Sequence, residues 1–92
     1  MTERIEKESF DDKLESENKE GSVLLLFNDD VNSFDFVIKS LIEVCFHTNI
    51  QAEQCAMIAH HKGYSEVKRG SSDVLMEMKI ELINKGLKAS IK

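Results

Sequence analysis

A run of five apolar residues, Val23–Phe27, passes directly into the polar group Asn28–Asp30, and this boundary constrains the fold more than any other stretch. A short continuous apolar run suits a strand that is covered on both faces or lies at the centre of a sheet. After the polar group, Asn32 or Ser33 can cap a helix, with Asp35 in its first turn, where a negative charge is favourable. The stretch therefore predicts a strand, a polar loop and the start of a helix.

The spacing of apolar residues further along the chain predicts the remaining elements. Steps of three and four residues indicate three helices, and period-two alternation indicates two more strands. The first expected helix runs from 34 to about 47–49, and the second covers about 51–62 with Gly63 as its C-terminal cap. The third runs from a capping turn at 70–73 to Gly86. The expected strands are 64–69 and 87–91. We therefore expect an α+β fold of order β-α-α-β-α-β, with three helices packed on one face of a small three-stranded sheet, mixed or antiparallel.

Charge divides the chain into two parts. Residues 1–20 hold eight acidic and four basic side chains, a net charge of −4, and their few apolar residues form no continuous face. The rest of the chain holds nine acidic and eight basic side chains. We therefore expect residues 1–21 to be an acidic flexible N-terminal extension and residues 22–92 to form one folded domain.

The same composition excludes several classes of partner. The nearly neutral domain has no basic footprint for nucleic acid. Its longest apolar run falls far short of the ~20 residues of a membrane span, and the acidic N-terminus does not resemble a signal peptide. We expect a cytoplasmic monomer with no nucleic-acid partner and no membrane partner.

Patterns for catalysis or metal binding are missing from the sequence. A calcium-binding loop that began at Asp30 would place Asp35 where such loops require glycine. Asp29 and Asp30 are neighbours, and neighbouring side chains in an extended chain point apart, so they do not make an acid–base pair. Cys45 and Cys55 lie ten residues apart with no Cys-x-x-Cys pair, which favours buried free thiols. We expect a protein that is not an enzyme and that holds no metal and no cofactor.

The polar group has two interpretations. On residue type alone, Asn28–Asp30 is a helix-capping turn. However, the order of motifs is an apolar strand, Asn-Asp-Asp, Phe34–Val37 and, about twenty residues later, His60–Gly63 with the pattern His-x-x-Gly. In this order the chain resembles the ClpS family, adaptor proteins that deliver substrates to Clp-type AAA+ unfoldase–protease machines. The resemblance covers residues 22 to about 70, and the order of the later elements agrees, so it implies a ClpS-like domain over 22–92.

The resemblance implies a receptor for a substrate's N-terminal residue, the N-degron, when its side chain is Leu, Phe, Tyr or Trp. Asn28 and His60 would accept hydrogen bonds from the α-amino group, and Asp29 would add the opposite charge. Asp30 and Asn32 would hold the loop and the first peptide unit. Such a receptor fits the chemistry of an α-ammonium group, which offers three donors and needs acceptors arranged around it.

The side-chain pocket implied by the resemblance departs from the usual family pattern. Phe34, Ala56 and Ala59 would line it, beside the acceptors, as a preformed hollow for a large apolar side chain. Phe34 stands where the family usually has a methionine at the pocket rim, and Ala56 corresponds to a second methionine. One side of the pocket therefore carries a larger side chain than the family pattern and another side a smaller one. We expect the pocket still to bind first residues with bulky apolar side chains.

The resemblance also implies partners. They are the N-terminal domain of a ClpA- or ClpC-type AAA+ unfoldase, with Asp73 and Lys79 as its candidate contacts, and substrate proteins or peptides that begin with an N-degron. The N-terminal extension would engage the unfoldase. The alternative is a ClpS-like protein that docks on the unfoldase without binding N-degrons, and acts as an inhibitor or modulator of substrate choice.

Overall fold

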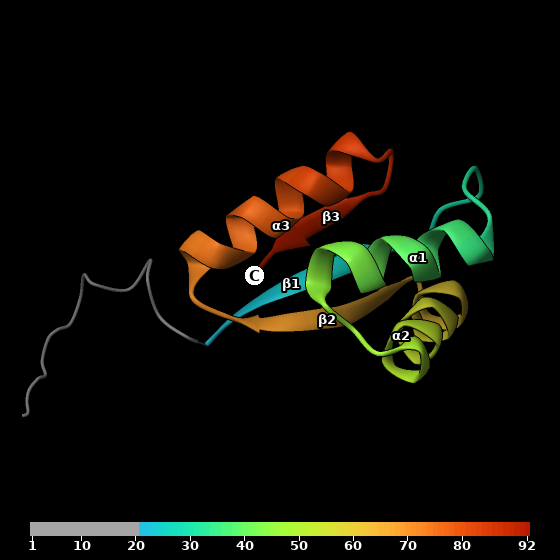
Figure 1. The fold of residues 1–92 in the computed structure, drawn as a ribbon, viewed down its shortest axis with the longest axis horizontal. Coiled ribbons are helices and arrows are strands. Elements are labelled where there is room, and N and C mark those ends of the chain that lie inside the picture. Colours follow the sequence, from blue (N-terminus) through green and yellow to red (C-terminus); the bar gives the residue numbers. More distant parts are fainter. Residues whose placement is uncertain (1–20) are drawn as a thin grey trace, which may run out of the picture.

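The computed structural model describes residues 21–92, and Figure 1 shows their arrangement. The elements are β1 (Ser22–Phe27), α1 (Phe34–Cys45), α2 (Asn49–Lys62), β2 (Tyr64–Gly70), α3 (Ser72–Asn84) and β3 (Ala89–Ile91). The predicted order β-α-α-β-α-β and the α+β class are confirmed. Of the predicted N-terminal extension, residues 1–20 lie outside the described residues. Across the described part of the chain, no helix combines the length and apolarity that crossing a bilayer requires.

The strand order β2-β1-β3 explains the continuous apolar run. Both neighbours pair with β1 in antiparallel register, so β1 is the central strand. Its residues 23–26 are all buried. Leu25 lies opposite Glu66 of β2 and Ser90 of β3, and the ladder with β2 shifts register between Leu24 and Leu25. The sheet is therefore wholly antiparallel, one of the two arrangements that the sequence left open.

The hydrophobic core lies between the helices and one face of the sheet. Leu24 and Leu26 of β1 and Val67 of β2 join a buried cluster with residues from all three helices. In β2, Ser65 and Val67 are buried while Tyr64 and Glu66 are exposed, so one face of this strand is covered and the other is open. The prediction that the helices pack on one face agrees with this alternation.

Local capping explains where the helices begin. Ser33, one of the two predicted caps, accepts a hydrogen bond from the backbone N–H of Phe36 at 3.1 Å. Thr48 and Gln51 form a reciprocal capping box that starts α2 at Asn49, two residues earlier than expected. Ser71 caps α3 by the same chemistry as Ser33.

The helix and strand ends differ from expectation in two places. Helix α1 ends at Cys45 because Phe46 adopts the left-handed conformation, with φ of 60°. Gly63 ends α2 with φ of 99°, as predicted. Strand β3 is shorter than the predicted 87–91, because the backbone N–H of Leu87 still bonds to the carbonyl of Leu82 at the end of α3. Leu87 therefore belongs to the turn before β3.

Candidate functional site

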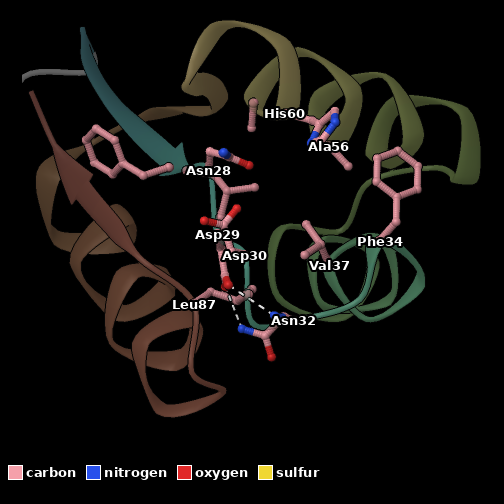
Figure 2. Close-up of a pocket in the computed structure, with 12 residues that line it drawn as sticks. Asn28, Asp29, Asp30, Asn32, Phe34, Val37, Ala56, His60 and Leu87 are labelled. Carbon is pink, nitrogen blue, oxygen red and sulfur yellow. Dashed lines mark hydrogen bonds between the residues drawn. The ribbon is translucent and has the colours of Figure 1, made fainter.

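A cavity of about 420 Å³ opens where β1 ends. Four parts of the chain surround it: the loop after β1, the start of α1, the C-terminal half of α2 and the turn before β3 (Figure 2). Its volume lies within the ~300–1,000 Å³ typical of small-ligand sites. The lining residues are Leu26, Phe27, Asn28, Asp29, Asp30, Asn32, Phe34, Val37, Ala56, Ala59, His60 and Leu87.

Asp29 organises the loop that forms the polar wall. Its Oδ1 accepts hydrogen bonds from the backbone N–H groups of Val31, at 2.6 Å, and Asn32, at 3.0 Å. Its Oδ2 accepts a third from the side-chain amide of Asn32 at 2.5 Å. A carboxylate has about four acceptor positions, so the loop already uses most of those on Asp29. The side chain therefore brings a negative charge to the cavity but few free acceptor positions.

The same hydrogen bonds favour the ionised form of the Asp29 carboxyl. The side-chain hydrogen bond from Asn32 is the largest of the effects that lower the pKa of the Asp29 carboxyl below its ordinary value, and the two backbone bonds act in the same direction. Donors that point at a carboxylate stabilise its charged form. The carboxylate is therefore ionised at neutral pH and makes this wall of the cavity attractive to a cation.

Asn32 connects the loop to a distant part of the fold. Its Nδ2 also donates to the backbone carbonyl of Gly86 at 3.0 Å. Gly86 has φ of 93° and directly precedes Leu87, which lines the cavity. One side-chain amide therefore holds the polar loop and the turn before β3 together.

The end of α2 supplies the next wall. The backbone N–H of Asn28 donates to the carbonyl of Gly63 at 2.9 Å, which ties the start of the loop to the C-terminal cap of α2. His60 lies one turn before Gly63, lines the cavity and is exposed to solvent. Figure 2 shows the Asn28 amide and the His60 imidazole as separate polar groups on this side of the cavity. Both can accept a hydrogen bond, and both line the same cavity as the carboxylates of the loop.

The rest of the cavity is apolar. Ala56 and Ala59 of α2 are each 4% exposed and contribute only methyl groups to the wall. Leu87 and Leu26 are also buried, and Val37 is half-buried. Phe34, the first residue of α1, is 41% exposed and stands at the rim. The site thus combines hydrogen-bond acceptors and negative charge at one side with an apolar hollow at the other.

The structure brings together eight of the ten residues that the sequence singled out. Asn28, Asp29, Asp30, Asn32, Phe34, Ala56, Ala59 and His60 all line this one cavity. Asp73 and Lys79 do not; they lie on α3, in its first turn and its middle. Six helical positions separate these two residues, which places them on different sides of the helix.

Four lining residues were not among the predicted site residues: Leu26, Phe27, Val37 and Leu87. Val37 ends the Phe34–Val37 motif, and Leu26 and Phe27 belong to the predicted strand. Leu87 is far from the other site residues in sequence, and only the turn after α3 brings it to the cavity. Within residues 21–92, no group of three or more histidine, cysteine or acidic side chains is arranged to hold a metal ion.

Comparison with known proteins identifies one family and several similar solved structures. The family model described as "ATP-dependent Clp protease adaptor protein ClpS" matches residues 17–90. One solved structure, that of Agrobacterium tumefaciens ClpS2 bound to L-phenylalaninamide, is similar, with a TM-score of 0.74 and 22% sequence identity, and the match covers 77% of this chain and 93% of that one. At this identity the likeness establishes the fold. No curated protein matches the chain.

Proposed function

Because the chain belongs to the ClpS family of adaptor proteins for ATP-dependent Clp proteases, we propose that it binds substrates through a free N-terminal residue with a bulky apolar side chain. It then delivers them to a Clp-type AAA+ unfoldase–protease for degradation. The first residues in question are Leu, Phe, Tyr and Trp. The role is that of a non-catalytic adaptor that works as a monomer in the cytoplasm.

One observation carries this proposal: acceptors and an apolar hollow share a single cavity. An α-amino group has a pKa of about 7.7–8.0 and is mostly charged at pH 7. Asn28 and His60 offer acceptors for its N–H donors, and Asp29 supplies the opposite charge. The hollow beside them receives the first side chain. Agrobacterium ClpS2, which has a similar fold, was solved with an amino acid amide bound, and this supports the same use of the cavity here.

The two residues proposed to contact the unfoldase lie on α3, outside the cavity. Asp73 and Lys79 of α3 are the candidate contacts for the N-terminal domain of a ClpA- or ClpC-type unfoldase, and neither lines the cavity. Helix α3 begins after Gly70, which pairs with Ser22 at the start of β1 (Figure 1). The cavity lies at the other end of β1. This separation is compatible with a substrate and an unfoldase on the protein at the same time.

Peptide titration tests the proposal directly. Fluorescent peptides that begin with Phe or Leu should bind, and the same Phe peptide with an acetylated α-amino group should not, because acetylation removes the charge and most of the donors. Asn28→Ala and His60→Ala should each weaken binding by about 10- to 150-fold, the equivalent of ~1.5–3 kcal/mol for a hydrogen bond to a charged group. His61→Ala is the matched control, since His61 is the exposed neighbour of His60 and does not line the cavity.

The pH dependence of binding gives an independent check. An imidazole nitrogen that accepts a hydrogen bond loses this ability when it is protonated. Affinity for the Phe peptide should therefore be lower at about pH 5.5 than at about pH 7.5. Affinity that stays constant over this range would remove His60 from the proposed receptor.

A second candidate function has one observation in its favour. Asp29 already accepts three hydrogen bonds within the loop, which limits what it can offer a ligand. The alternative is a protein that docks on the unfoldase but does not bind N-degrons. Unfoldase binding in a pull-down, combined with no difference between free and acetylated peptides, would favour this alternative over the adaptor.

A further inference from the structure

Phe34 is the one aromatic side chain that the start of α1 places at the cavity. Two phenylalanines lie in the first turn of this helix, Phe34 and Phe36, and both are partly exposed, at 41% and 36%. Phe34 lines the cavity and Phe36 does not. Figure 2 shows the ring of Phe34 extending from the start of α1 toward α2, on the side of Ala56. An exposed ring in this position presents a large flat surface to whatever enters the hollow.

The apolar residues that α2 contributes to the cavity have short side chains. Ala56 and Ala59 end at their methyl groups, and both are already buried by the surrounding fold. The remaining apolar lining comes from the aliphatic residues Val37, Leu26 and Leu87, and from Phe27 at the end of β1. The hollow is therefore open to a broad side chain on the α2 side, and the aromatic ring that extends toward that side is the ring of Phe34 (Figure 2).

We propose that the cavity prefers an aromatic first residue to an aliphatic one, and that Phe34 is the residue that determines this specificity. This inference rests on the proposed function, since it concerns the first residue of a substrate whose α-amino group is held by the polar wall. Two aromatic rings packed edge-to-face or offset gain stability beyond the area they bury, and an aliphatic side chain cannot make this contact. A Phe- or Trp-initiated substrate would therefore bind more tightly than a Leu-initiated one of the same length.

A saturated analogue separates ring chemistry from size. Three peptides would share one sequence after a first residue of Phe, cyclohexylalanine or Leu. Cyclohexylalanine has the carbon skeleton of Phe but no π system, so it buries similar apolar area without the aromatic contact. The wild-type protein should bind the Phe peptide about 2- to 12-fold more tightly than the cyclohexylalanine peptide, the factor expected for one aromatic pair.

Substitution at Phe34 assigns the effect to this ring. In Phe34→Leu the ratio of the two dissociation constants should fall to about 1, because the stacking partner is gone while the rim stays apolar. Phe36→Leu, the same change two positions away on the same helix and outside the cavity, should keep the wild-type ratio. Thermal melts of both variants establish that they are folded.

Each outcome of these measurements supports or overturns the proposed preference for an aromatic first residue. Equal or tighter binding of cyclohexylalanine by the wild type, or a ratio unchanged in Phe34→Leu, would overturn the inference while the proposed function stands. If Phe34→Leu fails to fold, the comparison of peptides on the wild type decides alone. If none of the three free-amine peptides binds, the proposed function fails and the inference fails with it.

Discussion

The side-chain amide of Asn32 donates to the backbone carbonyl of Gly86 at 3.0 Å, across 54 positions of the chain. The same amide nitrogen donates to Asp29, the residue that shapes the polar loop. Because Gly86 directly precedes the cavity-lining Leu87, this one side chain sets the separation of the polar wall from part of the apolar wall. The geometry of the cavity thus depends on a contact that lies at its edge.

Loss of this contact should affect both stability and binding. Asn32→Ala removes two hydrogen bonds in a partly exposed place, and we expect a loss of about 1 kcal/mol in the free energy of unfolding, together with weaker peptide binding. Asn32→Asp should lower the free energy of unfolding and the peptide affinity further, because a carboxylate cannot donate to Gly86 and would repel Asp29. Urea unfolding measures the first effect and peptide titration the second. Asn49→Ala, at an exposed asparagine that starts α2, is the control; an equal loss in that variant would contradict the prediction.

The low pKa of the Asp29 carboxyl should make the free energy of unfolding depend on pH. Its pKa in the folded protein lies below the ordinary value of 3.8, mainly because of the hydrogen bond from Asn32. A depressed pKa contributes stability that is present above the ordinary value and is lost as the pH falls through the folded one. We therefore expect Asp29→Asn to unfold more easily than the wild type at pH 7, with a difference that shrinks below pH 3.8. Unfolding curves over this range measure the difference.

Asp30→Asn is the natural comparison for that experiment. Asp30 follows Asp29 and lines the same cavity, but it takes part in none of the loop hydrogen bonds described for Asp29. Its substitution should leave the acid dependence of stability close to that of the wild type. If both variants changed the curve to the same extent, net charge rather than the loop would be the cause.

The two thiols should react at very different rates. Cys45 is fully buried, and burial raises the pKa of its thiol to about 11; burial also raises the pKa of the half-buried Cys55 thiol. Since the thiolate is the reactive form, labelling with a disulfide reagent at about pH 8 should modify Cys55 first, and Cys45 only when the protein unfolds. Cys55→Ser should then show almost no labelling until denaturant is added. Rapid labelling of this variant in buffer would contradict the buried position of Cys45.

The left-handed residue that ends α1 offers a route to greater stability. Phe46 has φ of 60° and is 74% exposed, so its side chain contributes little burial. A non-glycine residue in this conformation costs roughly 1–2 kcal/mol, and glycine adopts it freely, at an entropic cost of its own of roughly 0.5–1 kcal/mol. Phe46→Gly should therefore stabilise the protein by up to about 1 kcal/mol in urea unfolding. Phe46→Ala, which keeps the backbone cost, should not, and equal effects of the two would rule out this explanation.

Periodicity and capping residues were enough to predict the elements, because each depends on neighbours in the sequence. The predicted strand, Ser33 as a cap and Gly63 as a stop are all present. The start of α2 was missed because Thr48 and Gln51 form a capping box that lies just before its apolar stripe. The end of α1 was missed because Phe46 is not a residue type that indicates a left-handed conformation.

The candidate site was predictable in its polar part and less so in its walls. The Asn28–Asp30 and His60 motifs lie near the ends of elements that the sequence already placed, and the structure gathers them at one cavity. Leu87 and the bond from Asn32 to Gly86 depend on how α3 and β3 return to the first loop. No local pattern contains that information, because these residues are adjacent only after the sheet has formed.

The position of β1 has a mechanical consequence. It is the central strand, paired along both sides, and it is also the first element after the N-terminal segment. Antiparallel hydrogen bonds run perpendicular to the strands, so a force that pulls the chain from its N-terminal side loads both ladders in shear, and their bonds must break together rather than one at a time. A machine that grips the N-terminal segment would therefore meet a strand that is paired on both sides before any other described element, with the cavity at the far end of that strand.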